Sequence, residues 1–351
     1  MRSFATISTG ERLRRVKLSL PIAFSTMERP AQDLPLIIDD RTLANHLEAN
    51  LSALWGVIVT KEKQYTRFFL RRGKKSRMIH KPARTLSYIQ HMLLHKVFDR
   101  LPFGQHVIAY VPGRCCRDGA VPHTGKKVVL SMDISNFFTS VKRAQVRNAL
   151  SRYFPRHVAH LMAELSTCDN FVPQGAATSG AVANLVAQHT FDEKIIESLP
   201  AWTYTRYSDD LTLSSNSENL DIPAAIQTVT QHLRAFGFKV NPAKTRWVWA
   251  PKRQVVLGLQ VNNGVCLPRR KYHEIRALFN KAAEIGTLAL AKEQDRETWQ
   301  LEIYLRGLLS YVNSVDKKRH SSLLLVANQI EWSAPDARIG QGQEEAEAHA
   351  T

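Results

Sequence analysis

Two adjacent carboxylates, Asp209 and Asp210, stand between two short runs of alternating apolar residues and could bind a divalent cation. Residues 204–207 and 211–213 alternate as β-strands do, which predicts a hairpin with the acids at its turn. Ionised carboxylates in an apolar hairpin are costly unless a positive charge neutralises them, and Mg²⁺ readily takes carboxylate oxygens. An ordinary polar turn, in which Asp is common, explains this stretch equally well when it is taken alone.

A third carboxylate that could take part in the same chemistry is Asp133, which follows the apolar run at 128–132. The run is predicted to be a buried strand. If this strand neighbours the hairpin in one sheet, Asp133 and Asp209 converge. Two carboxylates that hold two Mg²⁺ ions stabilise both the attacking and the leaving oxygen of a phosphoryl transfer.

The charge of the chain restricts its substrate. The 351 residues include 48 Lys and Arg against 31 Asp and Glu, which gives a net charge of +17. A surplus of this size favours binding to a polyanion such as nucleic acid, although it says nothing about the fold. Together with the three acids it indicates a nucleotidyl transferase. No apolar run approaches the ~18 residues that cross a bilayer, so no membrane partner is expected.

The cysteines give neither a disulfide pattern nor a metal pattern. Cys115, Cys116, Cys168 and Cys266 include no C-x-x-C pair, which suits a reducing cytoplasm. Cys115 and Cys116 could ligate a metal together with His123. Adjacent cysteines span a tetrahedral site poorly, however, so structural thiols are the better interpretation.

The elements that must position the acids are amphipathic helices and short strands. The first thirty residues loosely resemble a transit peptide, but an arm that is disordered or contacts nucleic acid is the favoured interpretation. The apolar spacing predicts helices over 39–55, 84–98, 142–152, 156–166, 178–197 and 221–236, two strands around a basic turn in 65–82, a turn and strand in 237–249, a hairpin turning at Asn262–Gly264, and three helical segments in 269–332.

Five motifs in order across residues 65–270 resemble those of reverse transcriptases. They are S-M-D-I-S-N-F-F, V-P-Q-G-A-A-T-S-G, Y-S-D-D, G-F-K-V-N-P-A-K-T and V-L-G-L-Q-V. The resemblance implies an α+β right-hand polymerase fold, with fingers, a palm built on an antiparallel sheet, and a helical thumb.

The resemblance also implies a division of the chain. The expected parts are an N-terminal arm at 1–38, partly disordered, an N-terminal helix and fingers at 39–130, a palm at 131–264 with part of the fingers at 140–185, a helical thumb at 265–335, and a disordered acidic tail at 336–351.

By position, the resemblance makes Asp133 and Asp209 metal ligands, supported by Asp210 and by the main-chain carbonyl of Ile134. It implies two Mg²⁺ ions, with Mn²⁺ as an alternative. Lys244 matches a lysine that protonates the leaving pyrophosphate. A surface lysine near a strand is nearly as good an interpretation of Lys244.

The remaining site residues follow from the same motifs. Phe138, five residues after the first acid, is expected under the sugar, where its ring excludes a 2′-hydroxyl, although a core aromatic is the alternative. The expected dNTP-binding residues are Arg77, Lys81, Gln174 and, as a weaker candidate, Lys75. The expected primer and template contacts are Tyr207, Leu257, Gly258, Arg269, Arg270, Lys271 and His123.

Among reverse transcriptases, the bacterial retron type resembles this chain best, because the sequence is short and shows no trailing nuclease motif. Retron enzymes carry N-A-x-x-H before the first acid, where this chain has Gly119 to His123 as G-A-V-P-H. They carry V-T-G near the primer grip, where this chain has Val256-Leu257-Gly258.

The retron resemblance implies that a structured non-coding RNA serves as template and that its guanosine 2′-hydroxyl is the primer. The product is then single-stranded DNA joined to RNA (msDNA). It also implies a cytoplasmic enzyme that acts in anti-phage defence with a separate effector protein. The alternatives are a group II intron-derived, diversity-generating or CRISPR-associated reverse transcriptase, and, more remotely, an inactive RNA-binding module.

Overall fold

The computed structural model describes residues 34–73 and 75–332, so most of the expected N-terminal arm and all of the acidic tail lie outside the described residues. The helices are α1 (Asp40–His46), α2 (Leu51–Val59), α3 (Arg84–Lys96), α4 (Cys116–Ala120), α5 (Phe137–Ser140), α6 (Arg143–Leu150), α7 (Arg156–Ser166), α8 (Ser179–Ala187), α9 (Glu193–Ser198), α10 (Ile222–Ala235), α11 (Arg269–Glu293), α12 (Thr298–Val315) and α13 (Lys317–Ala327). The strands are β1 (Tyr65–Arg72), β2 (Lys75–Pro82), β3 (Val128–Ser135), β4 (Thr203–Tyr207), β5 (Asp210–Ser215), β6 (Lys239–Val240), β7 (Arg246–Trp249), β8 (Val255–Val256) and β9 (Leu259–Gln260).

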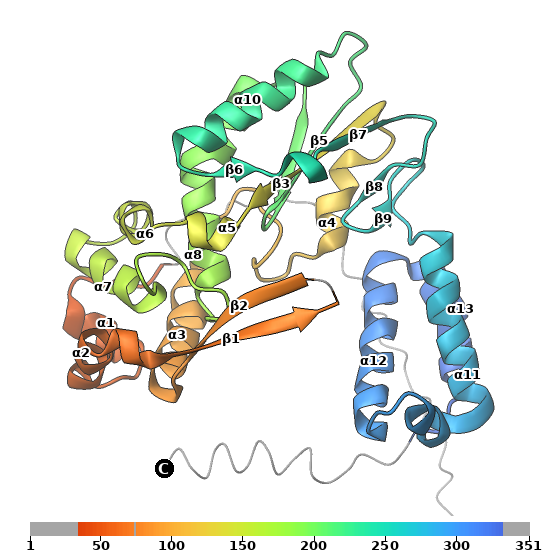
Figure 1. The fold of residues 1–351 in the computed structure, drawn as a ribbon, viewed down its shortest axis with the longest axis horizontal. Coiled ribbons are helices and arrows are strands. Elements are labelled where there is room, and N and C mark those ends of the chain that lie inside the picture. The colour runs from red at the N-terminus through yellow and green to blue at the C-terminus, as the bar shows by residue number, and fades with distance from the viewer. Residues whose placement is uncertain (1–33, 74, 333–351) are drawn as a thin grey trace, which may run out of the picture.

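An antiparallel sheet forms the palm, as expected. Its order is β4-β5-β3-β6, and β7 also pairs with β3 (Figure 1). Successive side chains of β3 point to opposite faces of the sheet. Leu130 and Met132 enter the core shared with α8 and α10, whereas Val129 belongs to a second core shared with the thumb. Asp133 leaves the same face as Val129, so the helices do not cover it.

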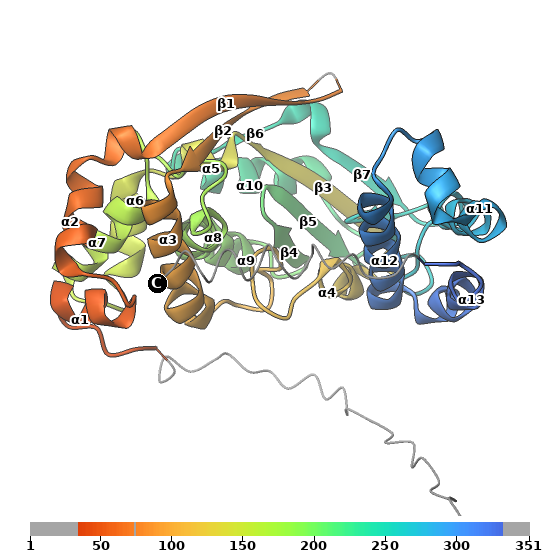
Figure 2. The ribbon, with the colours of Figure 1, turned by 90° about the horizontal axis from the view of Figure 1, so that it is seen from below.

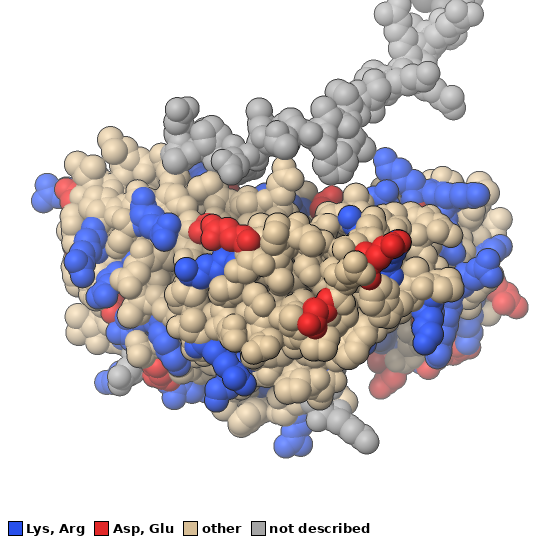
Figure 3. Space-filling view, turned by 90° about the horizontal axis from the view of Figure 1, so that it is seen from above, with Lys and Arg blue, Asp and Glu red and all other residues tan. Residues whose placement is uncertain are grey.

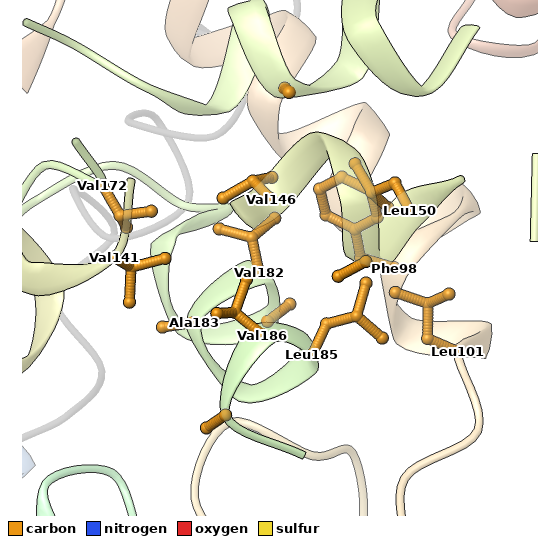
Figure 4. Packing of buried hydrophobic residues seen from close by; sticks show 14 of the residues in the cluster. Phe98, Leu101, Val141, Val146, Leu150, Val172, Val182, Ala183, Leu185 and Val186 are labelled. Atoms are coloured by element: carbon orange, nitrogen blue, oxygen red, sulfur yellow. The ribbon is translucent and has the colours of Figure 1, made fainter. Parts of the chain in front are cut away.

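The helix α8 is the centre of the main core. Its residues are small or apolar except Asn184, and every one of them is buried. A helix without a polar face has to be surrounded by other elements. Val182 lies beside Val146, and Leu185 lies beside Phe98 and Leu101 (Figure 4). The helix therefore fixes the palm against the helices of the fingers.

The expected fingers hairpin is confirmed as β1 and β2, which pair antiparallel along their full length. The hairpin extends from the helical group around α3 toward the thumb, along one side of the palm sheet (Figures 1 and 2). The His80 N–H donates to the carbonyl of Gln174 over 2.7 Å. Gly175 has φ +115°, and a Cβ there would come within 2.9 Å of Ile79. A glycine is therefore needed where this loop meets β2.

The three helical segments expected in the thumb are confirmed as α11, α12 and α13. Gly286 interrupts α11 with φ 79° and ψ 159°. The apolar core of the thumb continues into the palm through Ala120, Val129 and Val256. Packing therefore crosses the expected palm–thumb boundary at 264–265. No helix in the described ranges is both long enough and apolar enough to cross a bilayer.

One expectation about a helix was wrong, and one about a hairpin was incomplete. The helix expected over 39–55 is two helices, because Glu48 adopts φ 51° and the side chain of Asn50 accepts a hydrogen bond from Ser52 N–H to begin α2. The turn expected at Asn262–Gly264 is present, since Gln260 and Cys266 pair antiparallel across it. The expectation omitted the two-residue turn at Leu257 and Gly258, which joins β8 to β9 just before it.

Candidate active site

The three acids singled out in the sequence lie together at one end of the palm sheet. The antiparallel register of β3 and β5 pairs Asp133 with Asp210. Ser208, at φ 59°, and Asp209 form the two-residue turn between β4 and β5. The main-chain N–H of Ile134 donates to the carbonyl of Asp209 over 2.9 Å, which ties the turn to β3.

Lys244 partly neutralises this cluster. Its ammonium group pairs with the carboxylate of Asp133, and the side-chain amide of Asn241 donates to the same carboxylate over 3.3 Å. The hydrogen bond to Asp133 raises the pKa of Lys244, so the lysine stays protonated. Partial burial, with the negative charges of Asp209 and Asp133, raises the pKa of Asp210. The cluster therefore retains an affinity for further positive charge.

The donor set fits a divalent ion that shares its ligands with substrate. Within residues 34–73 and 75–332, no three His, Cys, Asp or Glu side chains are close enough to form a ready-made metal cage. Mg²⁺ is usually held by one or two carboxylates together with substrate phosphates. Asp133 and Asp209 could supply the carboxylates once Lys244 releases Asp133.

The main chain of Ile134 faces the acidic turn. Its N–H donates to Asp209, and Asn241 N–H bonds to the neighbouring Asp133 carbonyl instead. The N–H and C=O of one strand residue point to the same side. The carbonyl of Ile134 therefore points toward the acidic turn rather than toward β6.

A buried ion pair that was not predicted from the sequence supports the turn between β4 and β5. Arg206 of β4 is fully buried, and its guanidinium donates to the carboxylate of Asp192 over 2.8 and 3.0 Å. It also donates to the carbonyl of Ser208 over 3.3 Å and to the side chain of Asn184 over 2.7 Å. The residue next to Asp209 is thus hydrogen-bonded to a buried cation.

Asp192 ends a π-helical turn (Gln188–Asp192) between α8 and α9. Burial alone would raise the pKa of Asp192, but the charge and hydrogen bonds of Arg206, together with His106, hold it well below its usual range. The Tyr204 hydroxyl donates to the same carboxylate over 2.6 Å. Arg206 immediately precedes the Y-S-D-D motif, but nothing in the sequence shows that a charge there is buried.

The expected nucleotide-binding residues come from two elements that meet. Arg77 and Lys81 leave the same face of β2 as Ile79, which packs at Gly175 beside Gln174. Arg77 and Lys81 are exposed and available to a triphosphate. The side chain of Lys75 lies outside the described part of the structure.

Phe138 is the second residue of α5, five positions after Asp133. It is half-buried against Phe137, with ring centroids 5.5 Å apart. Its other ring neighbour is Tyr110, at 6.0 Å. None of the quoted motifs includes Tyr110.

The expected primer and template contacts are spread over three places. Tyr207 ends β4 opposite Asp210 and is partly exposed. Leu257 and Gly258 form the β8–β9 turn. The first turn of α11 exposes Arg269, Arg270 and Lys271. Tyr207 therefore lies beside the acids, whereas the basic residues Arg269, Arg270 and Lys271 lie in the thumb.

The assignment of His123 to primer or template is corrected. Its side chain is fully buried, and its ring nitrogens bond to the hydroxyls of Ser214 and Thr205 over 2.6 and 2.8 Å. Burial lowers the pKa of His123 to about 3. The residue is a neutral bridge inside the palm, out of reach of nucleic acid. Both ring nitrogens are therefore engaged, which leaves neither for a metal site with Cys115 and Cys116.

A right-hand arrangement of fingers, palm and thumb, with three acids at a β-hairpin, defines a nucleotidyl-transferring polymerase. Residues 61–261 match the family model of reverse transcriptases (RNA-dependent DNA polymerases). The chain is 29% identical over 322 residues to the retron Mx65 reverse transcriptase of Myxococcus xanthus, covering 83% of this chain and 71% of that protein. It is 29% identical over 262 residues to the retron Ec86 reverse transcriptase of Escherichia coli, covering 74% and 78%.

The chain therefore belongs to the reverse transcriptase family, and its relatives are retron-type enzymes. It is an RNA-directed DNA polymerase, a class that works with divalent metal ions.

Proposed function

We propose that this enzyme copies a structured non-coding RNA into single-stranded DNA that remains joined to the RNA, starting from a guanosine 2′-hydroxyl. The retron-type relatives support this proposal, because reverse transcriptases of the retron type act on a non-coding RNA template. The observation that carries the catalytic part is the pairing of Asp133 with Asp210 across β3 and β5, beside Asp209 in the turn.

In each addition, the primer hydroxyl gives up its proton to solvent and its oxygen forms a bond to the α-phosphorus, while the bond from that phosphorus to the bridging oxygen breaks. The electron pair of the broken bond leaves with pyrophosphate. Asp133, Asp209 and the carbonyl of Ile134 would hold Mg²⁺, with Asp210 beside them; Mn²⁺ is the alternative. When bound, the ion supplies positive charge to the attacking and leaving oxygens.

The chain's own residues orient the reactants and move the proton. Arg77 and Lys81 on β2 bind the triphosphate, and Gln174 lines the nucleotide pocket. Lys244 remains charged because its pKa is raised. Lys244, whose ammonium group pairs with Asp133 in this structure, would donate a proton to the leaving pyrophosphate.

The proposed biology is that of a two-component defence system in the cytoplasm. The retron resemblance supports a role against phage together with a separate effector protein. The four cysteines, free in the structure, support a reducing compartment.

Co-expression of the protein with the DNA that flanks its gene tests the proposal. Wild type should yield branched cDNA whose mobility changes on RNase treatment. Asp209→Asn should lower this product by about a thousandfold or more, as is typical when a catalytic group is removed. Asp295→Asn is the matched control, because Asp295 is exposed and sits at φ 50°, which Asn tolerates.

Two negative results have different meanings. DNA made on an added RNA template, but never joined to RNA, would contradict 2′-hydroxyl priming and leave the polymerase standing. Full activity in Asp209→Asn would contradict the assignment of the acids.

A further inference from the structure

Tyr110 is an exposed aromatic residue held in an unusual backbone conformation next to the three acids. Its side chain is 51% exposed and its φ is +58°. Bulky residues rarely adopt positive φ, and such strained positions cluster at functional sites. Neither metal binding nor the triphosphate contacts described above use this residue.

The surrounding structure holds Tyr110 from two sides. A Cβ at Gly180 of α8 would come within 2.4 Å of the Tyr110 Cγ, so only glycine lets the ring lie against this helix. The carbonyl of the preceding Ala109 accepts a hydrogen bond from the Asn184 side chain over 2.6 Å. The N–H of Ile108 donates to the carbonyl of Arg206 over 2.9 Å. The segment is thereby fixed to both α8 and β4.

Tyr110 connects the expected sugar-contacting ring to the catalytic turn. Its ring meets that of Phe138 at 6.0 Å between centroids and 60° between planes. This is an edge-to-face contact, which is a favourable geometry for aromatic pairs. Its hydroxyl lies 3.4 Å from the hydroxyl of Ser208, next to Asp209.

We propose that Tyr110 is a positioning residue for sugar selection, which holds the ring of Phe138 where it excludes the 2′-hydroxyl of an incoming ribonucleotide. The inference rests on the proposed role of Phe138. A ring rejects a single oxygen atom only if it cannot move aside. Phe138 is only half-buried in a four-residue helix, and Phe137 supports one side of it. Tyr110 supplies the other side.

Steady-state extension of a DNA primer on a plain RNA template tests the inference, with dNTP and rNTP compared by kcat/KM. Tyr110→Ala should lower the dNTP-over-rNTP preference about threefold to tenfold, the range expected for one aromatic contact. Tyr110→Phe keeps the ring and should keep the preference. Tyr88→Ala on α3, where the tyrosine is 48% exposed, is the matched control and should change nothing.

A double variant separates positioning from a general structural role. In Phe138→Ala, which should itself admit rNTP, adding Tyr110→Ala should cause no further loss of preference, because the ring that it positions is gone. Equal losses of kcat/KM for both nucleotides in Tyr110→Ala would overturn the inference. Additive effects in the double variant, or an unchanged preference in Phe138→Ala, would overturn it as well.

This assay needs neither the cognate RNA nor 2′-hydroxyl priming. Failure of the proposed retron chemistry would therefore leave its result intact.

Discussion

Gly119 and Leu257, the two positions at which the chain departs from the retron motifs, pack against each other. A Cβ at Gly119 would come within 2.7 Å of Leu257 Cδ1 and 3.2 Å of Ile108 Cγ1. Where retron motifs have Asn and Thr, this chain has a residue with no side chain and a larger apolar one. The two departures thus compensate each other at the junction of α4 with the β8–β9 turn.

We expect Gly119→Ala to destabilise the protein by about 1–3 kcal/mol, the usual cost of overpacking. Leu257→Asn should relieve the clash, because Asn is shorter. Asn also suits φ 50° followed by Gly258 at φ 81°, the pattern of a type I′ turn. Urea unfolding of both single variants and the double variant measures the coupling. If the changes in the free energy of unfolding were strictly additive, the contact with Leu257 would not be the reason that position 119 requires glycine.

His123 should make stability depend on pH. Its pKa, lowered by burial to about 3, lies below that of an unfolded histidine. Its contribution is therefore complete above about pH 6.5 and is lost as pH falls toward 3. Between about pH 7 and 5 the loss should reach at most about 2 kcal/mol.

Urea unfolding of wild type and His123→Gln at both pH values isolates this contribution. The pKa values of His80 and His189 are also lowered by burial, and both residues remain in each protein. The variant should lose less stability than wild type on acidification. An identical loss in the two proteins would contradict the assignment.

At the residue scale, the acids could be found from the sequence but their supports could not. Asp133 and Asp209 follow local alternation, and the pairing of short strands brings them together. The burial of Arg206 and the positive φ of Tyr110 depend on α8, which packs against both segments from elsewhere in the chain. His123 was assigned wrongly because the sequence does not show that the hydroxyls of Ser214 and Thr205 form hydrogen bonds with its buried ring.

At the scale of elements, the catalytic hairpin and the α8–α9 segment act as one unit through Arg206 and Asp192. A buried ion pair is strongly destabilising to break, since the remaining charge has no partner. Asp192→Asn should therefore lower the free energy of unfolding by about 3–5 kcal/mol. Glu218→Gln, which removes an exposed partner of Lys127, is the control and should leave the free energy of unfolding nearly unchanged.

The same pair has a defined pH dependence. Because the pKa of Asp192 is depressed, its contribution is present above about pH 4, the ordinary value for Asp, and is lost as pH falls further. In urea unfolding, Asp192→Asn should not show this loss in the free energy of unfolding at low pH. A variant as stable as wild type would mean that the pair does not hold the hairpin.

Element boundaries were predicted where a typical capping or turn residue sets them. They were missed where the boundary depends on an unusual backbone conformation. The Asp221 side chain caps α10, which begins at Ile222, one residue after the predicted start of the helix. The break between α1 and α2 needs Glu48 at positive φ, which its side chain does not favour. The turn at Asn262–Gly264 was predicted from its usual turn residues and is present, whereas Leu257 was placed in the primer grip by resemblance alone.

At the scale of the whole molecule, the surplus of positive charge is distributed along the protein. Lysine and arginine side chains lie toward both ends of the long axis on the face in Figure 3, where acidic side chains are few and separate. Charge alone therefore does not say which end meets RNA. The exposed basic residues at the start of α11 and those between α6 and α7 are at opposite ends of the molecule (Figure 1).

The thumb should dominate salt-dependent RNA binding, because α11 continues the segment that carries the β8–β9 turn beside the palm. Neutralising two phosphate contacts changes the slope of log affinity against log salt by about 1.4 to 1.8. We expect this change from Arg269→Ala combined with Arg270→Ala, and a much smaller one from Arg152→Ala combined with Arg156→Ala, which removes equal charge at the other end. Filter binding of structured RNA across a salt series measures both slopes. Equal changes in the two pairs would mean that RNA is held by the overall charge of the protein rather than by a path along the thumb.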